Sequence, residues 1–356
     1  MRSAAQWVRE DILALEAYHV SPAAGFVKLD AMESPYRLPP EVAAELGRVL
    51  AGVAVNRYPD PASPGLKQVL RASMGIPDHL GILLGNGSDE ILMMIALALA
   101  RPGAVMLSVE PSFVMYRMSA TMAGMGYEGV CLREDFTLDL PAVLAAVRRI
   151  RPAVTWLAYP NNPTGNLFER EAILEIVAAS PGLVVVDEAY YPYSGGATML
   201  DEVGRHPNLV LVRTVSKLGL AGLRLGLATG PADWLAQFDK LRLPYNVNVL
   251  TDAAARFILA RGDVLEAQVA RTNAERARLE AALDAMPGVR RFPSAANFVL
   301  VRLPDGPRAF EGLKARGILV RSFQGSHPLL DHCLRLTVGT PEENGKLIAA
   351  LAQVAA

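Results

Sequence analysis

Short apolar runs alternate with longer segments of helical pattern between residues 104 and 230, and this alternation restricts the possible folds more than any other feature. Each run is rich in β-branched residues and bounded by Gly, Pro, Asp or Asn; the runs are 104–109, 154–159, 183–186, 209–212 and 225–229. Strands that are apolar on both faces and separated by helices are typical of a mainly parallel sheet covered by helices on both sides. Because ligands of such sheets bind at the carboxyl ends of the strands, the residues after each run are the first candidates for a site.

The segments outside this region indicate a second, smaller unit. A helical segment and a Pro-rich arm at 34–40 open the chain, and helices are expected over 41–50 and 64–74. After residue 250 the pattern predicts one long helix at 252–283, strands at 298–302, 318–320 and 333–338, and helices at 309–316 and 347–356. We therefore expect an α/β chain with an N-terminal arm and part of a small domain in 1–45, a large domain in 46–250, and a C-terminal small α+β domain in 251–356.

Charge and cysteine content exclude several classes of protein. Lys plus Arg number 35 against 36 for Asp plus Glu, so the net charge of −1 does not favour binding to nucleic acid or an anionic membrane. Cys131 and Cys333 form no CxxC or Cys/His cluster and are expected to be buried, and the five histidines show no ligand spacing, so no metal site is expected. The longest apolar stretch, 91–100, is far shorter than the roughly 20 residues of a membrane span. We expect a cytoplasmic protein.

One lysine follows a predicted buried strand directly. Lys217 comes just after the run at 209–212, between the hydroxyl residues Thr214 and Ser216 and a series of glycines. Lysine is mostly found on surfaces, so an inward-pointing one needs a chemical reason. Schiff-base chemistry supplies such a reason, because desolvation lowers the pKa of the amine that must attack a carbonyl.

Polar residues lie at three other strand ends. The segment Gly85-Asn-Gly-Ser-Asp-Glu90 precedes an apolar helix with Ser88 as its predicted N-cap, which makes either a phosphate site or an ordinary capped helix. Asn162 lies between two prolines in a turn that either faces a ligand or is merely structural. Asp187 ends a buried run, with Tyr190 three residues later; its partner is either a protonated pyridine nitrogen or a structural salt bridge.

Taken together, these stretches resemble the fold type I pyridoxal-phosphate aminotransferases, and within them the histidinol-phosphate aminotransferase family. The resemblance spans nearly the whole chain. Each motif is weak alone, but their order and spacing are specific: Asn56-Arg-Tyr-Pro-Asp60, Gly85-Asn-Gly-Ser-Asp-Glu90, Asn161-Asn-Pro-Thr-Gly165, Asp187-Glu-Ala-Tyr190, Thr214-Val-Ser-Lys217, Arg224 and Arg335-Leu-Thr-Val-Gly339.

The resemblance implies roles for residues around pyridoxal 5′-phosphate. Lys217 is the lysine that bonds to the cofactor aldehyde, Asp187 pairs with the pyridine nitrogen, and Tyr190 and Asn162 donate to the 3-hydroxyl. Phe113 falls where the family stacks an aromatic ring on the cofactor. The phosphate is then bound by the backbone of Gly87, Ser88 and Asp89 and by Thr214, Ser216 and Arg224, with Tyr58 contributed by the second subunit of a homodimer.

The resemblance also implies a substrate: L-histidinol phosphate, with 2-oxoglutarate as amino acceptor, in histidine biosynthesis. By this resemblance, the guanidinium of Arg335 binds the substrate carboxylate through two parallel hydrogen bonds. Lysine cannot reproduce this bidentate geometry. In the histidinol-phosphate branch, Arg321, Arg335 and Asn248 meet the substrate phosphate and Tyr18 closes the pocket.

Two departures from the family pattern stand out: Ser34 replaces a common asparagine, and the segment from Lys217 to Arg224 is one residue shorter than in many relatives. The alternatives are an aromatic amino acid aminotransferase and a pyridoxal-phosphate lyase of the threonine-phosphate decarboxylase type. A cofactor-sensing transcription factor is disfavoured, because no basic DNA-binding segment precedes residue 40.

Overall fold

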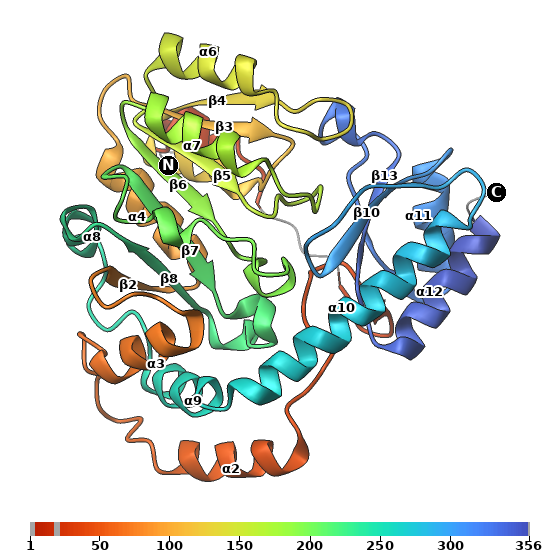
Figure 1. Cartoon of the computed structure of the whole chain (residues 1–356), viewed down its shortest axis with the longest axis horizontal. Coiled ribbons are helices and arrows are strands. Elements are labelled where there is room, and N and C mark those ends of the chain that lie inside the picture. The colour runs from red at the N-terminus through yellow and green to blue at the C-terminus, as the bar shows by residue number, and fades with distance from the viewer. Residues whose placement is uncertain (1–3, 18–21, 355–356) are drawn as a thin grey trace.

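A seven-stranded sheet forms the core of the larger part of the molecule (Figure 1). The computed structural model describes residues 4–17 and 22–354. The strand order is β2-β8-β7-β6-β5-β3-β4, and only β8 among these strands runs antiparallel to its neighbours. The strands are β2 (Gly81–Asn86), β3 (Val105–Glu110), β4 (Gly126–Cys131), β5 (Val154–Ala158), β6 (Leu183–Asp187), β7 (Leu209–Thr214) and β8 (Leu225–Gly230). The expectation of a mainly parallel mixed sheet between helices is confirmed.

Two of these strands, β2 and β4, are absent from the sequence prediction. β2 has only three apolar residues between glycines, so its apolar run is too short to stand out. β4 lies at the edge of the sheet, where its side chains are half-buried or exposed and need not be apolar. Cys131 ends this edge strand and is exposed, so its expected burial is wrong, whereas Cys333 is buried.

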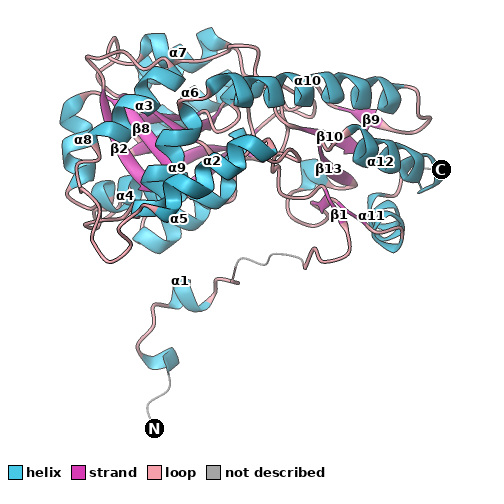
Figure 2. Ribbon diagram, turned by 90° about the horizontal axis from the view of Figure 1, so that it is seen from below, coloured by secondary structure: helices cyan, strands magenta, loops and turns pink. Residues whose placement is uncertain are grey.

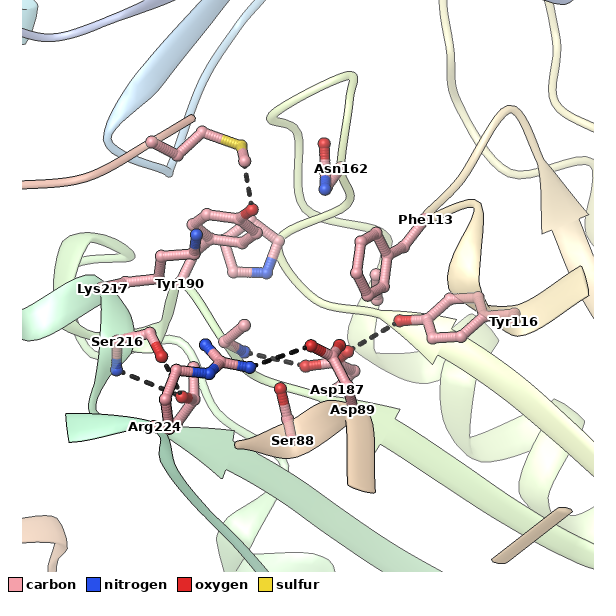
Figure 3. Close-up of a pocket in the computed structure, with 15 residues that line it drawn as sticks. Ser88, Asp89, Phe113, Tyr116, Asn162, Asp187, Tyr190, Ser216, Lys217 and Arg224 are labelled. Atoms are coloured by element: carbon pink, nitrogen blue, oxygen red, sulfur yellow. Dashed lines mark hydrogen bonds and ion pairs between the residues drawn. The ribbon is translucent and has the colours of Figure 1, made fainter. Parts of the chain in front are cut away.

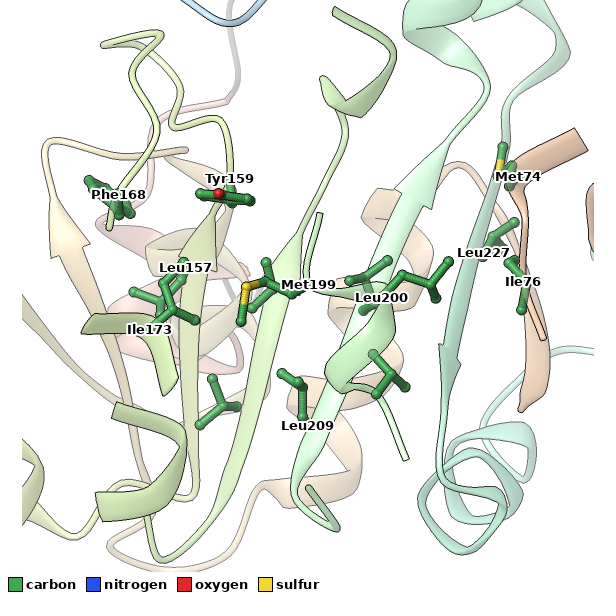
Figure 4. Packing of buried hydrophobic residues seen from close by; sticks show 14 of the residues in the cluster. Met74, Ile76, Leu157, Tyr159, Phe168, Ile173, Met199, Leu200, Leu209 and Leu227 are labelled. Atoms are coloured by element: carbon green, nitrogen blue, oxygen red, sulfur yellow. The ribbon is translucent and has the colours of Figure 1, made fainter. Parts of the chain in front are cut away.

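Helices cover both faces of the sheet because successive residues of each strand point to opposite sides. Along β6, Val184 and Val186 pack into one apolar cluster, and Leu183 and Val185 pack into the other. The first cluster, part of which is drawn in Figure 4, includes residues of α3 (Pro64–Met74), α6 (Leu140–Ile150), α7 (Arg170–Ala179) and α9 (Val249–Leu259). The second includes residues of α4 (Ser88–Leu99), α5 (Met115–Ala123) and α8 (Ala232–Asp239).

The C-terminal part of the chain forms a smaller α+β unit. Its antiparallel sheet has the order β12-β13-β10-β9 and is packed by α11 (Gly306–Ala315) and α12 (Pro341–Val354). The strands are β9 (Arg290–Arg291), β10 (Phe298–Arg302), β12 (Arg321–Ser322) and β13 (Cys333–Thr337). β1 (Val27–Lys28) from the N-terminal segment pairs in parallel with β11 (Ile318–Leu319), so this segment joins the C-terminal unit. The exact division into domains stays a prediction.

The long helix expected at 252–283 is in fact two helices, α9 and α10 (Gly262–Asp284). The backbone leaves helical geometry at Arg261, with φ −111° and ψ 54°, directly before Gly262. This break lets α9 pack on the large sheet while α10 runs across to the smaller unit (Figure 1). Periodicity alone does not reveal such a break, because the pattern predicts helix on both sides of it and does not mark where one helix ends.

The N-terminal segment that carries α1 (Glu10–Leu13) projects below the body of the molecule in the view of Figure 2. Its only α-helix in the described part is the single turn α1, and Arg9 just before it donates to the carbonyl oxygens of Thr121 and Met122 at the end of α5, at 2.6 and 3.1 Å. The next helix is α2 (Pro40–Ala51). Within the residues that the structure describes, no helix is both long and apolar enough to cross a membrane.

A buried ion pair links the large sheet to α3. Arg213 donates to Glu188 Oε2 at 2.8 Å and to the carbonyl oxygen of Met74 at 2.7 Å, and both charged side chains are almost inaccessible. Arg213→Met is expected to destabilise the protein by about 3–5 kcal/mol, because it leaves a buried carboxylate unpaired. The midpoint of urea unfolding measures this loss. The double variant Arg213→Met/Glu188→Leu should regain most of it, and an unchanged midpoint in the single variant would contradict the assigned role.

Candidate active site

A cavity lies at the carboxyl edge of the large sheet (Figure 3). Polar groups enter it from strand ends, as the alternating pattern predicts. Its lining includes most of the cofactor-site residues expected from the sequence: Ser88, Asp89, Phe113, Asn162, Asp187, Tyr190, Thr214, Ser216, Lys217 and Arg224. The tertiary structure therefore brings together residues that are spread over more than a hundred positions of sequence.

Lys217 projects into this cavity from the short 3₁₀ turn η4 (Ser216–Leu218), which follows β7 directly. Its Nζ lies 3.4 Å from the carbonyl oxygen of Ala31 and 5.7 Å from the centre of the Tyr190 ring. Desolvation, assisted by the positive charge of Arg335, lowers the pKa of Lys217 to about 8. About a tenth of the amine is thus neutral and nucleophilic at pH 7.

Asp187 lies at the back of the cavity, at the end of β6, and its side chain is buried. The Tyr116 hydroxyl donates to its Oδ2 at 2.9 Å and the backbone N–H of Ala189 donates to its Oδ1 at 3.1 Å. Burial raises the pKa of Asp187 to about 6, although both hydrogen bonds act in the opposite direction. Tyr116 is not among the site residues expected from the sequence. The feature that could have indicated it is its position three residues after Phe113, just beyond the end of β3.

Hydroxyl groups and an arginine lie at the other end of the cavity. The Thr214 hydroxyl lies 2.9 Å from the Ser216 hydroxyl, and Arg224 pairs with Asp89 at 3.2 Å. Arg224 reaches the cavity despite the short segment after Lys217.

The N-terminus of α4 opens toward this same end of the cavity. Ser88 is the first residue of α4 rather than its N-cap, so that prediction is wrong. The N-cap is Gly87, whose φ of 81° suits glycine, and a Cβ there would lie 2.6 Å from the Arg224 guanidinium. The hydroxyls, the free N–H groups of α4 and Arg224 together form a site suited to an anion such as phosphate.

The remaining side of the cavity carries donors and an aromatic ring. Arg335 donates to the Asn162 Oδ1 at 2.6 Å, which directs the NH₂ group of that amide elsewhere as a donor. The Tyr190 hydroxyl lies 3.1 Å from the Met32 sulfur, and Phe113 lines the cavity beside Asn162. The roles expected for Asn162, Tyr190 and Phe113 against a flat ring stay predictions.

A second cavity adjoins the first, shares Met32, Phe113 and Asn162 with it, and is also lined by Arg335. Arg321 also lines this second cavity. The two arginines lie directly opposite each other on the antiparallel strands β12 and β13, so their side chains leave the same face of the small sheet. Two guanidinium groups beside the lysine site favour a doubly anionic or phosphorylated substrate.

Among the residues that the structure describes, Gly87, Asn248 and Tyr58 of the expected site line neither cavity. Asn248 caps α9 by accepting hydrogen bonds from the N–H groups of Leu250 and Thr251, so its oxygen is already engaged. Tyr58 is 80% exposed and stacks on Tyr245 with ring centres 4.4 Å apart. Tyr18 lies outside the described residues.

The residues present fit pyridoxal 5′-phosphate. Among the described residues, Asp187 forms no ion pair although it is buried, so it lacks a cationic partner of the kind a protonated ring nitrogen supplies. The amine of Lys217 and the anion site around α4 lie on other walls of the same cavity. Within the described residues, no group of three or more His, Cys, Asp or Glu side chains could hold a metal ion.

Comparison with known proteins agrees with this geometry. Residues 24–351 match the family model described as aminotransferase class I and II, which defines the class of protein. The chain is 56% identical to a histidinol-phosphate aminotransferase of Chromobacterium violaceum and 53% identical to histidinol-phosphate aminotransferase 1 of Burkholderia mallei, in both cases over 97% of each chain. The chain therefore belongs to the histidinol-phosphate aminotransferase family within that class.

A solved structure shows the same fold with a cofactor present. The histidinol-phosphate aminotransferase of Sinorhizobium meliloti, solved in complex with pyridoxal-5′-phosphate, superposes with a TM-score of 0.88 at 28% identity. The match covers 99% of this chain and 98% of that one, so the fold type I assignment holds over the whole molecule.

Proposed function

We propose that this chain is a pyridoxal-phosphate-dependent aminotransferase that converts L-histidinol phosphate and 2-oxoglutarate to imidazole acetol phosphate and L-glutamate, in histidine biosynthesis. The observation that carries the proposal is the pair of arginines, Arg321 and Arg335, placed opposite each other beside the Lys217 cavity. The high identity to named relatives over nearly the whole chain supports the same substrate.

In the proposed mechanism, the chemical step depends on two side chains, Lys217 and Asp187. When bound, pyridoxal phosphate supplies the electron sink that makes the substrate Cα acidic. Lys217 Nζ, neutral above about pH 8, takes the proton from that Cα and returns it at the cofactor's C4′ carbon. Asp187 holds the proton at the ring nitrogen.

The other side chains orient the reactants. Asn162 and Tyr190 donate to the 3-hydroxyl, and Arg335 binds the carboxylate of the amino-acid substrate. The hydroxyls of Ser88, Thr214 and Ser216 bind the cofactor phosphate together with Arg224. Because one site serves donor and acceptor in turn, we expect ping-pong kinetics.

A homodimer completes this proposal, with Tyr58 reaching the cofactor phosphate of the second subunit. What supports it is the exposure of Tyr58 near other exposed apolar side chains, Val55, Leu243 and Tyr245, since a monomer rarely leaves such residues in water. Location in the cytoplasm stays a prediction from the sequence. Size-exclusion chromatography with light scattering measures the oligomeric state.

A panel of amino donors with 2-oxoglutarate tests the substrate. We expect the largest kcat/KM for L-histidinol phosphate, and a larger value for phenylalanine would favour the aromatic aminotransferase instead. Release of carbon dioxide from threonine phosphate without an oxo acid would favour the decarboxylase. Aspartate serves as a dicarboxylic donor that lacks both the ring and the phosphate.

Arg321→Ala sharpens this test. Loss of one charge-assisted contact to a phosphate is expected to lower kcat/KM for L-histidinol phosphate by ~100-fold. The value for phenylalanine, which carries no phosphate, should change far less. Arg308→Ala, at an exposed position on α11 of the same unit, is the matched control. Equal losses for both donors would contradict a phosphate-specific role of Arg321.

A further inference from the structure

The carboxylate of Asp187 receives one hydrogen bond from the chain on each of its oxygens. The Tyr116 hydroxyl donates to Oδ2 at 2.9 Å, and the Ala189 N–H donates to Oδ1 at 3.1 Å. The acidic groups nearby, Asp89 from α4 and Glu188 from the same segment, disfavour a second negative charge. These two donors are therefore the groups of the cofactor-free chain that oppose protonation of Asp187 most directly.

Tyr116 is fixed in place by its neighbours. Its side chain is fully buried, and its ring stacks on Trp156 with centres 5.1 Å apart and meets Phe113 edge-on at 5.7 Å. Burial raises the pKa of Tyr116 well above its usual value, so the phenol keeps its proton and acts toward the carboxylate as a donor. Figure 3 shows the hydroxyl pointing at Asp187 from the side opposite Lys217.

We propose that Tyr116 is a positioning residue: its hydroxyl keeps Asp187 ionised and oriented toward the cofactor ring nitrogen, and so sets the lowest pH at which the chain holds its cofactor tightly. The inference rests on the proposed function only in taking pyridoxal phosphate as the cofactor. A hydrogen bond from a neutral donor stabilises a carboxylate over the carboxylic acid, which accepts the bond less well. Without the hydroxyl, Asp187 takes up a proton at higher pH and can no longer pair with a protonated ring nitrogen.

The sign of the pH effect follows from this linkage. Well above the pKa of Asp187, the carboxylate is ionised with or without the Tyr116 hydroxyl, so removing the hydroxyl costs little cofactor affinity. As the pH is lowered, Asp187 is protonated at a higher pH in the variant than in the wild type. The variant must then release this proton before it binds the cofactor, so its cofactor affinity falls at a higher pH than that of the wild type. Lys217 and Arg224 also face the cavity, but their charges act alike in both proteins and cancel in the ratio of the two dissociation constants.

Tyr116→Phe tests the proposal because it removes one oxygen and leaves the ring on Trp156. Pyridoxal phosphate is titrated into cofactor-free wild type and variant, and its dissociation constant is measured by absorbance from about pH 9 to about pH 6. The ratio of variant to wild-type constants should be near one at the alkaline end and rise to ~10-fold or more at the acid end. A ratio that is large but independent of pH would mean a purely structural role and would overturn the proposal, as would a ratio near one throughout.

Two further variants separate the explanations. Ser119→Ala removes another buried hydroxyl from α5, one with no hydrogen-bond partner among the described residues, and should bind like wild type at every pH. In an Asp187→Asn background, which cannot titrate, Tyr116→Phe should no longer change the pH dependence. A persisting effect there would exclude action through Asp187. Asp187→Asn alone should lose the wild-type weakening of cofactor binding at acid pH, and a weakening that persists would show that Asp187 is not the titrating group and would overturn the proposal. None of these measurements uses an amino donor, so their failure is distinct from failure of the proposed substrate.

Discussion

Replacing Lys217 with alanine is expected to lower kcat/KM for transamination by ~10⁴-fold or more, because proton transfer and covalent attachment both depend on this one amine. Its position explains the size of the effect: within the cavity lining of the described residues, Lys217 is the sole primary amine. The measurement is a coupled assay with L-histidinol phosphate and 2-oxoglutarate, with the visible absorbance of bound pyridoxal phosphate as a second readout.

The Lys217→Ala protein should still fold, since within the described part of the chain the Lys217 amine makes one long hydrogen bond, at 3.4 Å to the carbonyl oxygen of Ala31. Lys240→Ala, at an exposed position after α8, is the matched control and should keep wild-type activity. Added ethylamine should restore part of the proton transfer in Lys217→Ala but not in a misfolded protein. Turnover at the wild-type rate without Lys217 would exclude the whole catalytic assignment.

Arg335→Lys is expected to lower kcat/KM by ~100-fold for both glutamate and L-histidinol phosphate. The reason is that one ammonium group cannot replace a guanidinium that binds the substrate and donates to groups of the chain at the same time. Arg335 donates to Asn162 at 2.6 Å and to the carbonyl oxygen of Asp30 at 2.8 Å, and only 6% of it is exposed. Lysine keeps the charge but loses the geometry that orients both the substrate and Asn162. Initial rates at varied concentrations of each substrate give the two values.

A matched change on the neighbouring strand controls for a general effect of arginine loss. Arg302→Lys on β10 removes a guanidinium that donates to the carbonyl oxygen of Leu329 outside the cavities, and we expect little change in kcat/KM. If Arg335→Lys left kcat/KM unchanged for both substrates, Arg335 would not bind their anionic groups.

Much of the large sheet could be predicted from the sequence, because buried parallel strands must be apolar on both faces. The runs now seen as β3, β5, β6, β7 and β8 are readable for that reason, whereas the edge strand β4 is not, since half-exposed positions carry no apolar constraint. The break before Gly262 was also hidden, because the residues on both sides of it form helices and the pattern does not mark the boundary.

The residues of the candidate site also differ in whether the sequence alone could indicate them. Lys217, Asp187 and Asn162 were found because each follows a readable strand and belongs to a motif. Tyr116 was missed because an interior tyrosine on a helix is usually a packing residue, and only the fold shows that its hydroxyl meets Asp187. The cap of α4 was misassigned because Gly87 and Ser88 are both acceptable there, and the contact with Arg224, far along the chain, favours glycine.

The sequence by itself determined which side chains stand at the ends of the large sheet, since strand periodicity and local motifs are properties of short segments. Only the tertiary structure decided how those side chains meet. The opposition of Arg321 and Arg335 depends on the register of β12 and β13, and the bond from Tyr116 to Asp187 depends on how α5 packs on the sheet. Both contacts join residues that are distant in sequence, so no local pattern encodes them.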